Sequence, residues 1–361
     1  MVNRTDHAGI DVSAQEYQPD RVDMRILHAL QVEPRATWAE LAPVVGADAT
    51  NLSRRWARLR DAGIAWVTGM TDGGDRSGAA LIEIECAPGD LHATAAALSR
   101  DPEVVTVDYT VGGRDLVATV ITDSPHQVAD YALGPMARLS GIRAARTHLV
   151  TERLLDARRW RLRELSSADV ARIPRFRPPR SRAARAIAPE LRAVIRRELA
   201  ADGRASAAAI AARSGFSAQR VTDAIATLRT SGELYLRTDL ARDLSDWPIY
   251  TWYFLQVPAP AMAQARITLA QVPEVRLAVL CASRYNLVLA VWLRSMQDVQ
   301  AFEVALARAL PGAVIADRSV VVRIAKHLGH VLGVNGRATG EVVPMSRETS
   351  PLVEHSTTME P

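Results

Sequence analysis

The feature that most constrains the fold of this chain is an internal repeat. Residues 35–67 align without gaps onto residues 204–236, at an offset of 169 (204 − 35), and the identical positions include two glycine pairs, Gly46/Gly215 and Gly63/Gly232. A second match places residues 102–122 on residues 273–293. Because sequence repeats indicate repeated structural units, the 361 residues are predicted to contain two copies of a two-domain module.

The first domain of each module has the pattern of a helix-turn-helix. Apolar residues recur at helical spacing over residues 22–30, and Thr37 with Glu40 forms a capping box before a second helix at 38–45. Gly46 suits a left-handed turn, and a third helix is predicted over residues 49–61, followed by a strand at 64–67. This order is typical of winged helix-turn-helix DNA-binding domains.

The third helix carries the predicted DNA contacts, because arginines cluster there and polar residues stand at its exposed N-terminal end. At the offset of 169, Arg54 matches Asp223 and Arg55 matches Ala224, so the first copy is expected to supply most of the DNA affinity. The alternative is a three-helix bundle with a solvated basic face. The predicted DNA-binding residues are Asn51, Ser53, Arg54, Arg55, Arg58, Gln219, Arg220 and Thr222.

The second domain of each module is predicted to be a ferredoxin-like sandwich. Strand and helix patterns follow the order βαββαβ within residues 78–155 and again within residues 248–326. The turn Gly112-Gly113-Arg114-Asp115 separates the second and third strands of the first copy. The predicted fold class is therefore α+β, with two winged helix-turn-helix domains, each followed by a ferredoxin-like βαββαβ domain.

An arginine-rich linker separates the two modules. Residues 157–185 contain ten arginines against Glu164 and Asp169, so this segment lies on DNA phosphates or is simply solvated. Its length permits the two ferredoxin-like domains to pack together within one chain. The predicted boundaries are a disordered tail at 1–19, winged helix-turn-helix 1 at 20–70, ferredoxin-like effector or oligomerisation domain 1 at 78–155, the linker at 157–186, winged helix-turn-helix 2 at 187–240, ferredoxin-like effector or oligomerisation domain 2 at 248–326, and a disordered tail at 335–361.

The pattern of residues 20–155 resembles the leucine-responsive and asparagine regulator (Lrp/AsnC, feast/famine) family, and residues 187–326 resemble it more weakly, as a tandem second copy. The resemblance implies a sequence-specific transcriptional regulator that responds to a small effector such as an amino acid. The matching positions are Asp23, Arg35, Ala39, Glu40, Leu41, Ala42, Gly46, Ser53, Arg54, Arg55, Leu59, Gly63 and Ile64.

The resemblance also implies an effector site near the glycine turn, where two α/β domains pair. Position by position, it assigns effector binding to Gly112, Gly113, Asp115 and Thr147. In the second copy, residues 283–286 have the sequence Ser-Arg-Tyr-Asn in place of Gly-Gly-Arg-Asp, so a second site has altered chemistry or is absent. A hairpin without a ligand is the alternative for the first copy.

Composition and motifs favour a protein without catalytic residues, metal or cofactor. The net charge is +4, the two cysteines have no metal-ligand spacing, and no hydrolase, zinc or phosphate-loop motif is present. The chain is therefore predicted not to be an enzyme. Its expected partner is double-stranded DNA, with an intra-chain pseudo-dimer that stays single or forms a homo-oligomer.

Two other functions remain open. One is an enzyme similar to the siroheme decarboxylases, which share the tandem architecture, but residues 281–292 offer Arg284 and Tyr285 and no histidine for an interdomain cleft. The other is a scaffold whose helix-turn-helix domains contact only proteins. No apolar run reaches the roughly 18 residues that a membrane helix needs, and no secretion signal is visible, so a cytoplasmic protein without membrane contact is expected.

Overall fold

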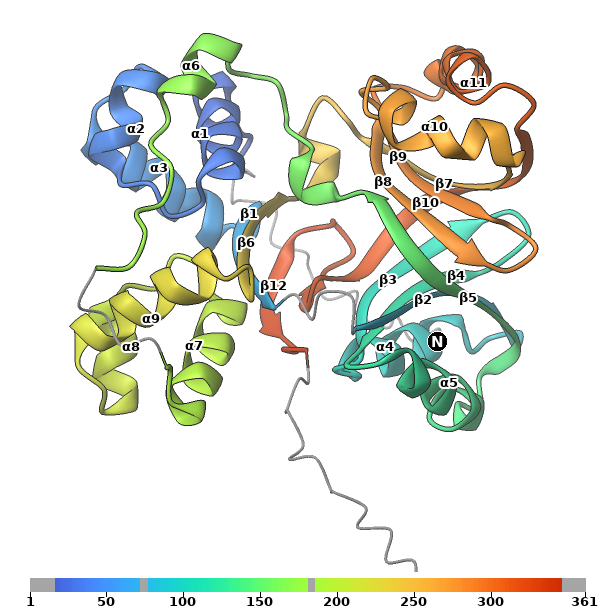
Figure 1. The fold of residues 1–361 in the computed structure, drawn as a ribbon, viewed down its shortest axis with the longest axis horizontal. Coiled ribbons are helices and arrows are strands. Elements are labelled where there is room, and N and C mark those ends of the chain that lie inside the picture. The colour runs from blue at the N-terminus through green and yellow to red at the C-terminus, as the bar shows by residue number, and fades with distance from the viewer. Residues whose placement is uncertain (1–16, 72–76, 181–185, 346–361) are drawn as a thin grey trace, which may run out of the picture.

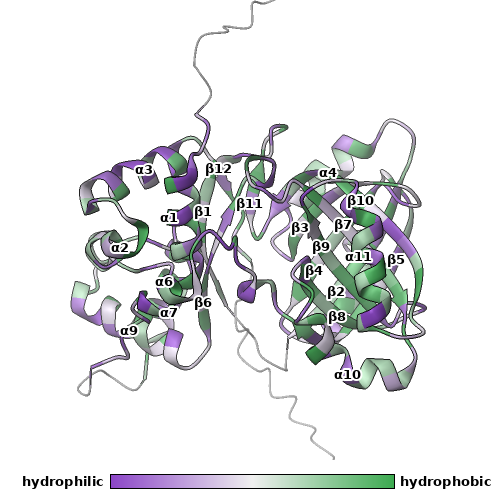
Figure 2. Cartoon of the chain, turned by 90° about the horizontal axis from the view of Figure 1, so that it is seen from above, coloured by the Kyte–Doolittle hydropathy of each residue, from purple (hydrophilic) through white to green (hydrophobic). Residues whose placement is uncertain are grey.

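A computed structural model describes residues 17–71, 77–180 and 186–345. Two helical units lie on one side of the molecule and a β-barrel lies on the other (Figure 1). A two-stranded sheet stands between them, as Figure 2 shows from above. No helix within the described residues combines the length and the apolar composition needed to cross a membrane.

The first helical unit forms as the apolar spacing and caps predict. Asp20 and Asp23 make a capping box at the start of the first helix, and Gly46 ends the second helix with φ 84°. Leu30, Leu41 and Leu59 are fully buried where the three helices meet. The elements are α1(Arg21–Val32), α2(Trp38–Val45), α3(Ala49–Asp61) and the wing strand β1(Ala65–Thr71).

The second helical unit has the same order of elements and its own apolar core, which includes Ile195, Ile210 and Val221. Its wing strand pairs antiparallel with β1, so the two wings form one sheet. The elements are α7(Pro189–Ala201), α8(Ala207–Ser214), α9(Ala218–Thr230) and β6(Leu234–Leu240).

Eight strands form the barrel, in the order β10-β3-β4-β2-β5-β8-β9-β7, and β10 also pairs with β7 to close the ring. Each half has the predicted βαββαβ order, and the expected contact between the halves is made by β5 with β8 and β10 with β3. The strands are β2(Gly78–Cys86), β3(Val104–Val111), β4(Leu116–Thr122), β5(Ile142–Leu155), β7(Ile249–Gln256), β8(Val275–Ala282), β9(Leu287–Leu293) and β10(Val314–His327).

This closure corrects the prediction that each half forms a ferredoxin-like sandwich of its own, because the two sheets join edge to edge into one barrel. An isolated four-stranded sheet leaves a row of unpaired backbone groups along each edge, and pairing edge with edge satisfies them. Side chains then alternate between two environments. Ile82 and Ile84 point outward beneath the helices, whereas Leu81 and Glu83 belong to the interior of the barrel.

Helices cover the outer face of the barrel, and short helices occupy the connections. Phe302 and Leu306 bury the last covering helix against Tyr253 and Leu255. The covering helices are α4(Leu91–Arg100), α5(Pro125–Leu133), α10(Ala259–Leu269) and α11(Asp298–Ala309). The short helices are η2(Met136–Arg138), η3(Ala157–Arg159), α6(Ser167–Arg172) and η4(Arg242–Leu244).

The ends of the described chain extend into the segments predicted as tails. Tyr17 donates to the Asp23 carboxylate at 2.5 Å, and the small strands β11(His330–Leu332) and β12(Ala338–Val342) extend the sheet beyond β10. The amide of Ala338 donates to the carbonyl of Gly63 at 2.8 Å. The C-terminal strand therefore touches the turn between α3 and its wing. Residues 1–16 and 346–361 of the predicted tails lie outside the described residues.

Candidate functional site

Helix α3 presents a basic, solvent-exposed face in the first helical unit. The Asp48 side chain accepts from the amide of Asn51 at 2.9 Å and begins the helix. Leu52, Trp56 and Leu59 are buried. Ser53, Arg54 and Arg58 therefore point away from the core and are exposed, as a DNA-contacting face requires; the Arg58 guanidinium lies 5.2 Å from the centre of the Tyr17 ring.

Arg55 has a structural role instead. Its Nη1 lies 2.8 Å from Asp20 Oδ2 and 3.0 Å from Asp23 Oδ1, and its Nε donates to the Asn51 side chain at 3.1 Å. The Asp23 side chain is fully buried. Burial would raise the pKa of Asp20, but the hydrogen bond from the Asp23 amide and the Arg55 guanidinium hold it below its usual value. Asn51 and Arg55 thus stabilise the first helical unit in the unbound chain.

Helix α9 carries the second set of predicted DNA contacts. Ser217 caps it, and Gln219, Arg220 and Thr222 are exposed. The Thr222 hydroxyl donates to the Ala218 carbonyl at 2.9 Å. Like α3, this helix leaves its N-terminal turns open to solvent.

An acid of α9 is already engaged by the linker. Arg180 Nη2 lies 2.7 Å from Asp223 Oδ2, and the Gln219 amide donates to the same carboxylate at 3.1 Å. The Phe176 ring lies beneath the Arg229 guanidinium, 4.2 Å from its carbon. The linker therefore reaches the face of α9 where Arg54 stands in α3.

The arginine-rich linker is packed along much of its length. Leu162, Leu165 and Ile173 are buried in the core that includes α1, and the amides of Leu162 and Leu165 donate to Gln31 and His28. Residues 181–185 of the predicted linker lie outside the described residues. The linker was expected either to lie on DNA phosphates or to be solvated. Up to residue 180 neither description is complete, because its apolar residues pack against the protein.

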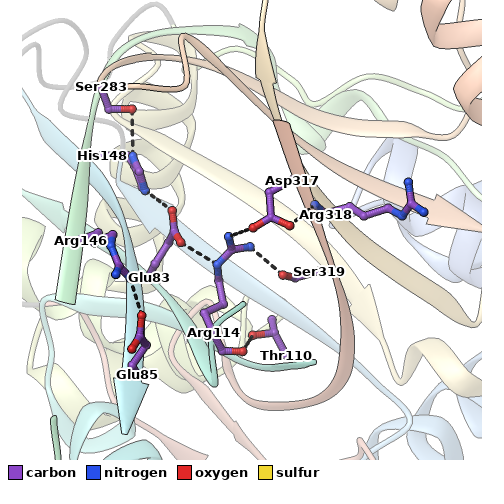
Figure 3. Close-up of polar contacts among 10 residues, drawn as sticks. All are labelled: Glu83, Glu85, Thr110, Arg114, Arg146, His148, Ser283, Asp317, Arg318 and Ser319. Atoms are coloured by element: carbon purple, nitrogen blue, oxygen red, sulfur yellow. Dashed lines mark hydrogen bonds and ion pairs between the residues drawn. The ribbon is translucent and has the colours of Figure 1, made fainter. Parts of the chain in front are cut away.

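A buried ionic network crosses the interior of the barrel (Figure 3). Arg114 Nε lies 2.7 Å from Glu83 Oε2, and its two Nη atoms donate to Ser319 and Asp317 in the other half of the chain. His148 connects Glu83 to Ser283. Burial would raise the pKa of Glu83, but His148 and Arg114 keep it below its usual value. The network joins the two halves through charges that satisfy one another.

The four residues predicted to bind an effector do not line the large pocket described below. Gly112, Gly113 and Thr147 are exposed, and the Asp115 carboxylate accepts from the amide of Cys86 at 2.7 Å. Sequence reasoning missed Arg114, which lies between them and points into the barrel. The signal that was available is the presence of two acids, Glu83 and Glu85, within an otherwise apolar strand.

A concave site lies where the wing sheet meets the mouth of the barrel, and we call it the wing pocket. Its cavity measures about 160 Å³, and the wider space between its walls, which includes open solvent, measures about 1190 Å³. Trp66 and Tyr235 come from the two wing strands, whereas Tyr250, Trp252 and Trp292 come from the barrel. The walls are therefore mainly aromatic and apolar, as in many small-molecule sites.

Five arginines and three aspartates also line the wing pocket. Asp239, on β6, forms ion pairs through its Oδ1 with Arg276 at 2.7 Å and Arg237 at 2.9 Å, and His327 Nε2 lies 3.3 Å from the same oxygen. Burial would raise the pKa of Asp239, but these partners hold it far below its usual value. Burial also lowers the pKa of His327. The arginines are Arg153, Arg237, Arg242, Arg276 and Arg323, and the aspartates are Asp156, Asp239 and Asp243.

Sequence reasoning did not find this pocket. The sequence-based hypothesis considered a histidine for the interdomain cleft only within residues 281–292. In the structure, His327 enters the pocket from the end of β10 and Arg237 enters it from β6. The side chains come from segments that no local pattern connects. Within the described residues, no group of three His, Cys, Asp or Glu side chains is arranged to hold a metal ion.

Comparisons with known proteins match the first half of the chain. Residues 20–60 match the AsnC-type helix-turn-helix domain, and residues 79–160 match the Lrp/AsnC ligand binding domain. An uncharacterized HTH-type transcriptional regulator of Pyrococcus furiosus is 23% identical over 135 residues, which are 37% of this chain and 91% of the relative. One from Pyrococcus abyssi is 23% identical over 141 residues, covering 38% and 89%.

The whole architecture is similar to that of an enzyme. The crystal structure of the siroheme decarboxylase NirDL superposes with a TM-score of 0.53 at 14% identity, covering 86% of this chain and 93% of that protein. NirDL is also known in complex with an iron-uroporphyrin III analogue, with a TM-score of 0.52. The prediction that this chain is not an enzyme was therefore wrong. An enzyme has a similar fold, so the fold does not exclude catalysis.

The family matches and the fold agree on the first half of the molecule. The matched segments coincide with α1–α3 and with the strands and helices from β2 to β5. Through residues 20–160, this chain carries the two domain types of the Lrp/AsnC family, a DNA-binding helix-turn-helix followed by an effector-binding domain.

Proposed function

We propose that this chain is a transcriptional regulator that binds double-stranded DNA through helix α3. The observation that carries the proposal is the exposed pair Arg54 and Arg58, which lie one helical turn apart and have no carboxylate partner among the described residues. Free guanidinium groups on one helix face bind phosphates and the guanine edges of the major groove. Ser53 stands beside them at the end that would enter the groove.

The two helical units differ as DNA-binding surfaces. Asp223 of α9 takes the position that Arg54 has in α3 at the offset of 169, and Arg180 neutralises it. Gln219, Arg220 and Thr222 remain available on α9. We infer that α3 supplies most of the affinity and that α9 adds a weaker contribution.

We also infer that the chain is a fused two-copy form of a regulator that pairs its α/β domains. The strand orders β5-β2-β4-β3 and β10-β7-β9-β8 are equivalent in the two halves. The wing register is symmetric as well, because Ala65 pairs with Leu240 and Thr71 with Leu234, and both pairs exchange under the shift of 169. A fused chain then supplies both sides of the pairing surface itself.

The test is a titration of the native operator, recovered from genomic fragments that the full chain retains. The double variant Arg54→Ala/Arg58→Ala should weaken binding and lower the dependence of log K on log salt by about two units, roughly one for each phosphate that the variant can no longer neutralise. Gln219→Ala/Arg220→Ala is the matched change on α9 and should cost less. Equal losses of affinity, or no loss from the first variant, contradict the assignment to α3.

A second candidate is an enzyme that decarboxylates a carboxylated iron tetrapyrrole. It is favoured by the likeness to NirDL over 86% of the chain together with a wing pocket that contains arginines, aromatic rings and His327. Decarboxylation breaks the bond from a side-chain carbon to its carboxyl carbon, releases carbon dioxide and requires a proton at the remaining carbon. Tyr235, Tyr250 and His327 are the pocket groups that can hold such a proton.

The experiment for this candidate is anaerobic incubation of the full chain with siroheme, followed by mass spectrometry of the tetrapyrrole. Loss of carbon dioxide that disappears in His327→Ala supports the enzyme. Siroheme recovered unchanged, with DNA binding intact, supports the regulator alone.

A further inference from the structure

The wing pocket lies between the wing sheet of the helical units and the barrel. Trp66 and Met70 belong to β1, which follows α3 directly, whereas Arg276 and Trp292 belong to the barrel. We propose that the wing pocket binds a flat conjugated molecule carrying at least two carboxylates, and that this ligand controls DNA binding by fixing the wing sheet on the barrel. The control of DNA binding rests on the proposed function, whereas ligand binding does not.

Charge is the first argument for an acidic ligand. The pocket holds five arginines against three aspartates. Asp156 pairs with Arg153, Asp243 pairs with Arg242, and Asp239 is shared by two arginines and His327. Arg323 has no carboxylate partner among the described residues, although it lies 5.2 Å from the centre of the Tyr109 ring. A carboxylate ligand would complete the charge balance of this wall.

Unpartnered polar atoms are the second argument. Buried donors without acceptors are rare in folded proteins, and a group of them around one site indicates a missing partner. Arg276 Nη1, Arg323 Nε and Trp66 Nε1 are buried donors without a hydrogen-bond partner, and all three residues line the wing pocket. The Asp239 Oδ2 and His327 Nδ1 atoms of the same pocket are also without a partner. Burial, and then Arg237, lower the pKa of Arg276 to about 9, so its positive charge is poorly compensated. A ligand with two acidic groups can satisfy both Arg276 and Arg323.

Shape and aromatic content argue for a conjugated plane. The Arg276 guanidinium lies 3.6 Å from the centre of the Trp292 ring and 5.4 Å from that of Trp160. Trp252 and Tyr250 continue the same wall, with ring centres 5.6 Å apart. Aromatic walls favour stacking or edge contact with another ring system, and the acidic groups of the ligand would then project toward the arginines.

The same contacts explain how the ligand reaches the DNA-binding face. Arg276 of β8 and Arg237 of β6 meet at Asp239, so this carboxylate joins the barrel to the wing sheet. A ligand carboxylate competes with Asp239 for these arginines and therefore alters the contact between the barrel and the wing sheet. Because β6 pairs with β1 along its length, a shift of the wing sheet is passed to α3 through the short turn at Gly63.

Equilibrium dialysis of the full chain against two probes tests ligand binding. Uroporphyrin III represents a carboxylated tetrapyrrole, and naphthalene-2,6-dicarboxylate represents a small aromatic diacid. At least one probe should bind, and Arg323→Gln should weaken that binding at least tenfold, because Arg323 loses its charge without losing an ion pair inside the protein. Arg308→Gln, on the exposed face of α11, is the matched control and should leave binding unchanged.

The outcomes separate the ligand sources. Binding of the porphyrin alone assigns a tetrapyrrole, and binding of the diacid assigns a smaller effector. Failure of both probes at millimolar concentration, or equal binding by the Arg323→Gln and Arg308→Gln variants, overturns the ligand proposal. Arg276→Met is a second variant, and thermal unfolding shows whether it retains the fold.

The regulatory part is tested by repeating the operator titration with saturating probe. Operator affinity should change at least fivefold in the parent chain and should be unchanged by probe in Arg323→Gln. If Arg54→Ala/Arg58→Ala removes DNA binding but keeps probe binding, ligand and DNA sites are distinct. If no operator is bound by any form while the probe still binds, the proposed function fails and the ligand site stands.

Discussion

Arg35 and Arg204 hold the two helical units together by exchanging equivalent hydrogen bonds. Arg35 donates to the carbonyls of Gly203 at 2.7 Å and Ala205 at 2.9 Å, and Arg204 donates to the carbonyls of Pro34 and Ala36. Burial, followed by the neighbouring Arg35, lowers the pKa of Arg204 to about 10. The two like charges are tolerated because each is satisfied by backbone oxygens of the opposite unit.

Replacement of Arg35 by alanine should therefore loosen the contact between the units. Two charge-assisted hydrogen bonds are removed and two carbonyls are left without their donors, so the free energy of unfolding should fall by about 2–4 kcal/mol. Urea denaturation of Arg35→Ala and Arg204→Ala measures this change. Arg308→Ala, an exposed change, serves as control, and a decrease no greater than that of the control would show that the exchange is not stabilising.

Arg55 should act on stability more than on DNA affinity. Its partner Asp23 is buried and would keep a charge without its cation, so Arg55→Ala should lower the free energy of unfolding by about 1–3 kcal/mol. A double-mutant cycle with Asp23→Asn isolates the pair. A coupling energy near zero at pH 7 would assign Arg55 to DNA instead.

Gly63 and Gly232 form a matched pair for the role of the C-terminal strand. Both have positive φ, 65° and 79°, so alanine at either position should cost about 1–2 kcal/mol of unfolding free energy. A Cβ at Gly63 would also lie 2.2 Å from the Ala338 carbonyl oxygen, whereas nothing lies within 4 Å at Gly232. Thermal unfolding should therefore show the larger loss of stability for Gly63→Ala.

Truncation after Asn335 provides the control for that comparison, because it removes β12 with Ala338. In the truncated chain the two alanine variants should lose similar amounts of stability. A difference that persists without β12 would mean that the proximity of Ala338 is not its cause.

Asp108 should give the protein a measurable dependence of stability on pH. Burial raises its pKa to about 7, while its Oδ2 accepts from the Trp252 indole at 2.9 Å. The folded state then binds a proton between about pH 4 and pH 7 that the unfolded state has released, so stability falls as pH rises through this window. The slope should approach about 1.4 kcal/mol per pH unit.

The Asp108→Asn variant should remove this part of the slope, because its amide cannot titrate. Urea unfolding of both proteins at pH 5, 6, 7 and 8 gives the comparison. Parallel curves for the two proteins would show that Asp108 is not the titrating group.

The sequence by itself determined the local elements of this protein. The capping box of Thr37 and Glu40, the glycine at position 46 and the alternating apolar residues of the strands act over a few residues, so they placed α2, α3, β3 and β4 at their observed bounds. The repeat also indicated that the second half of the chain follows the same order. The family matches support the two domain types of the first half, over residues 20–60 and 79–160.

Only the tertiary structure decided how these elements meet. Closure of the barrel depends on β5 finding β8 and β10 finding β3, and a strand pattern does not state which edge its strand will join. The same holds for side chains. Arg55 looked free on its helix until Asp23 was placed beside it, and Arg237, Arg276 and His327 converge on Asp239 only because the wing sheet folds over the barrel mouth. Local periodicity encodes which face of an element is buried, whereas a site built from distant segments exists only once their packing is complete.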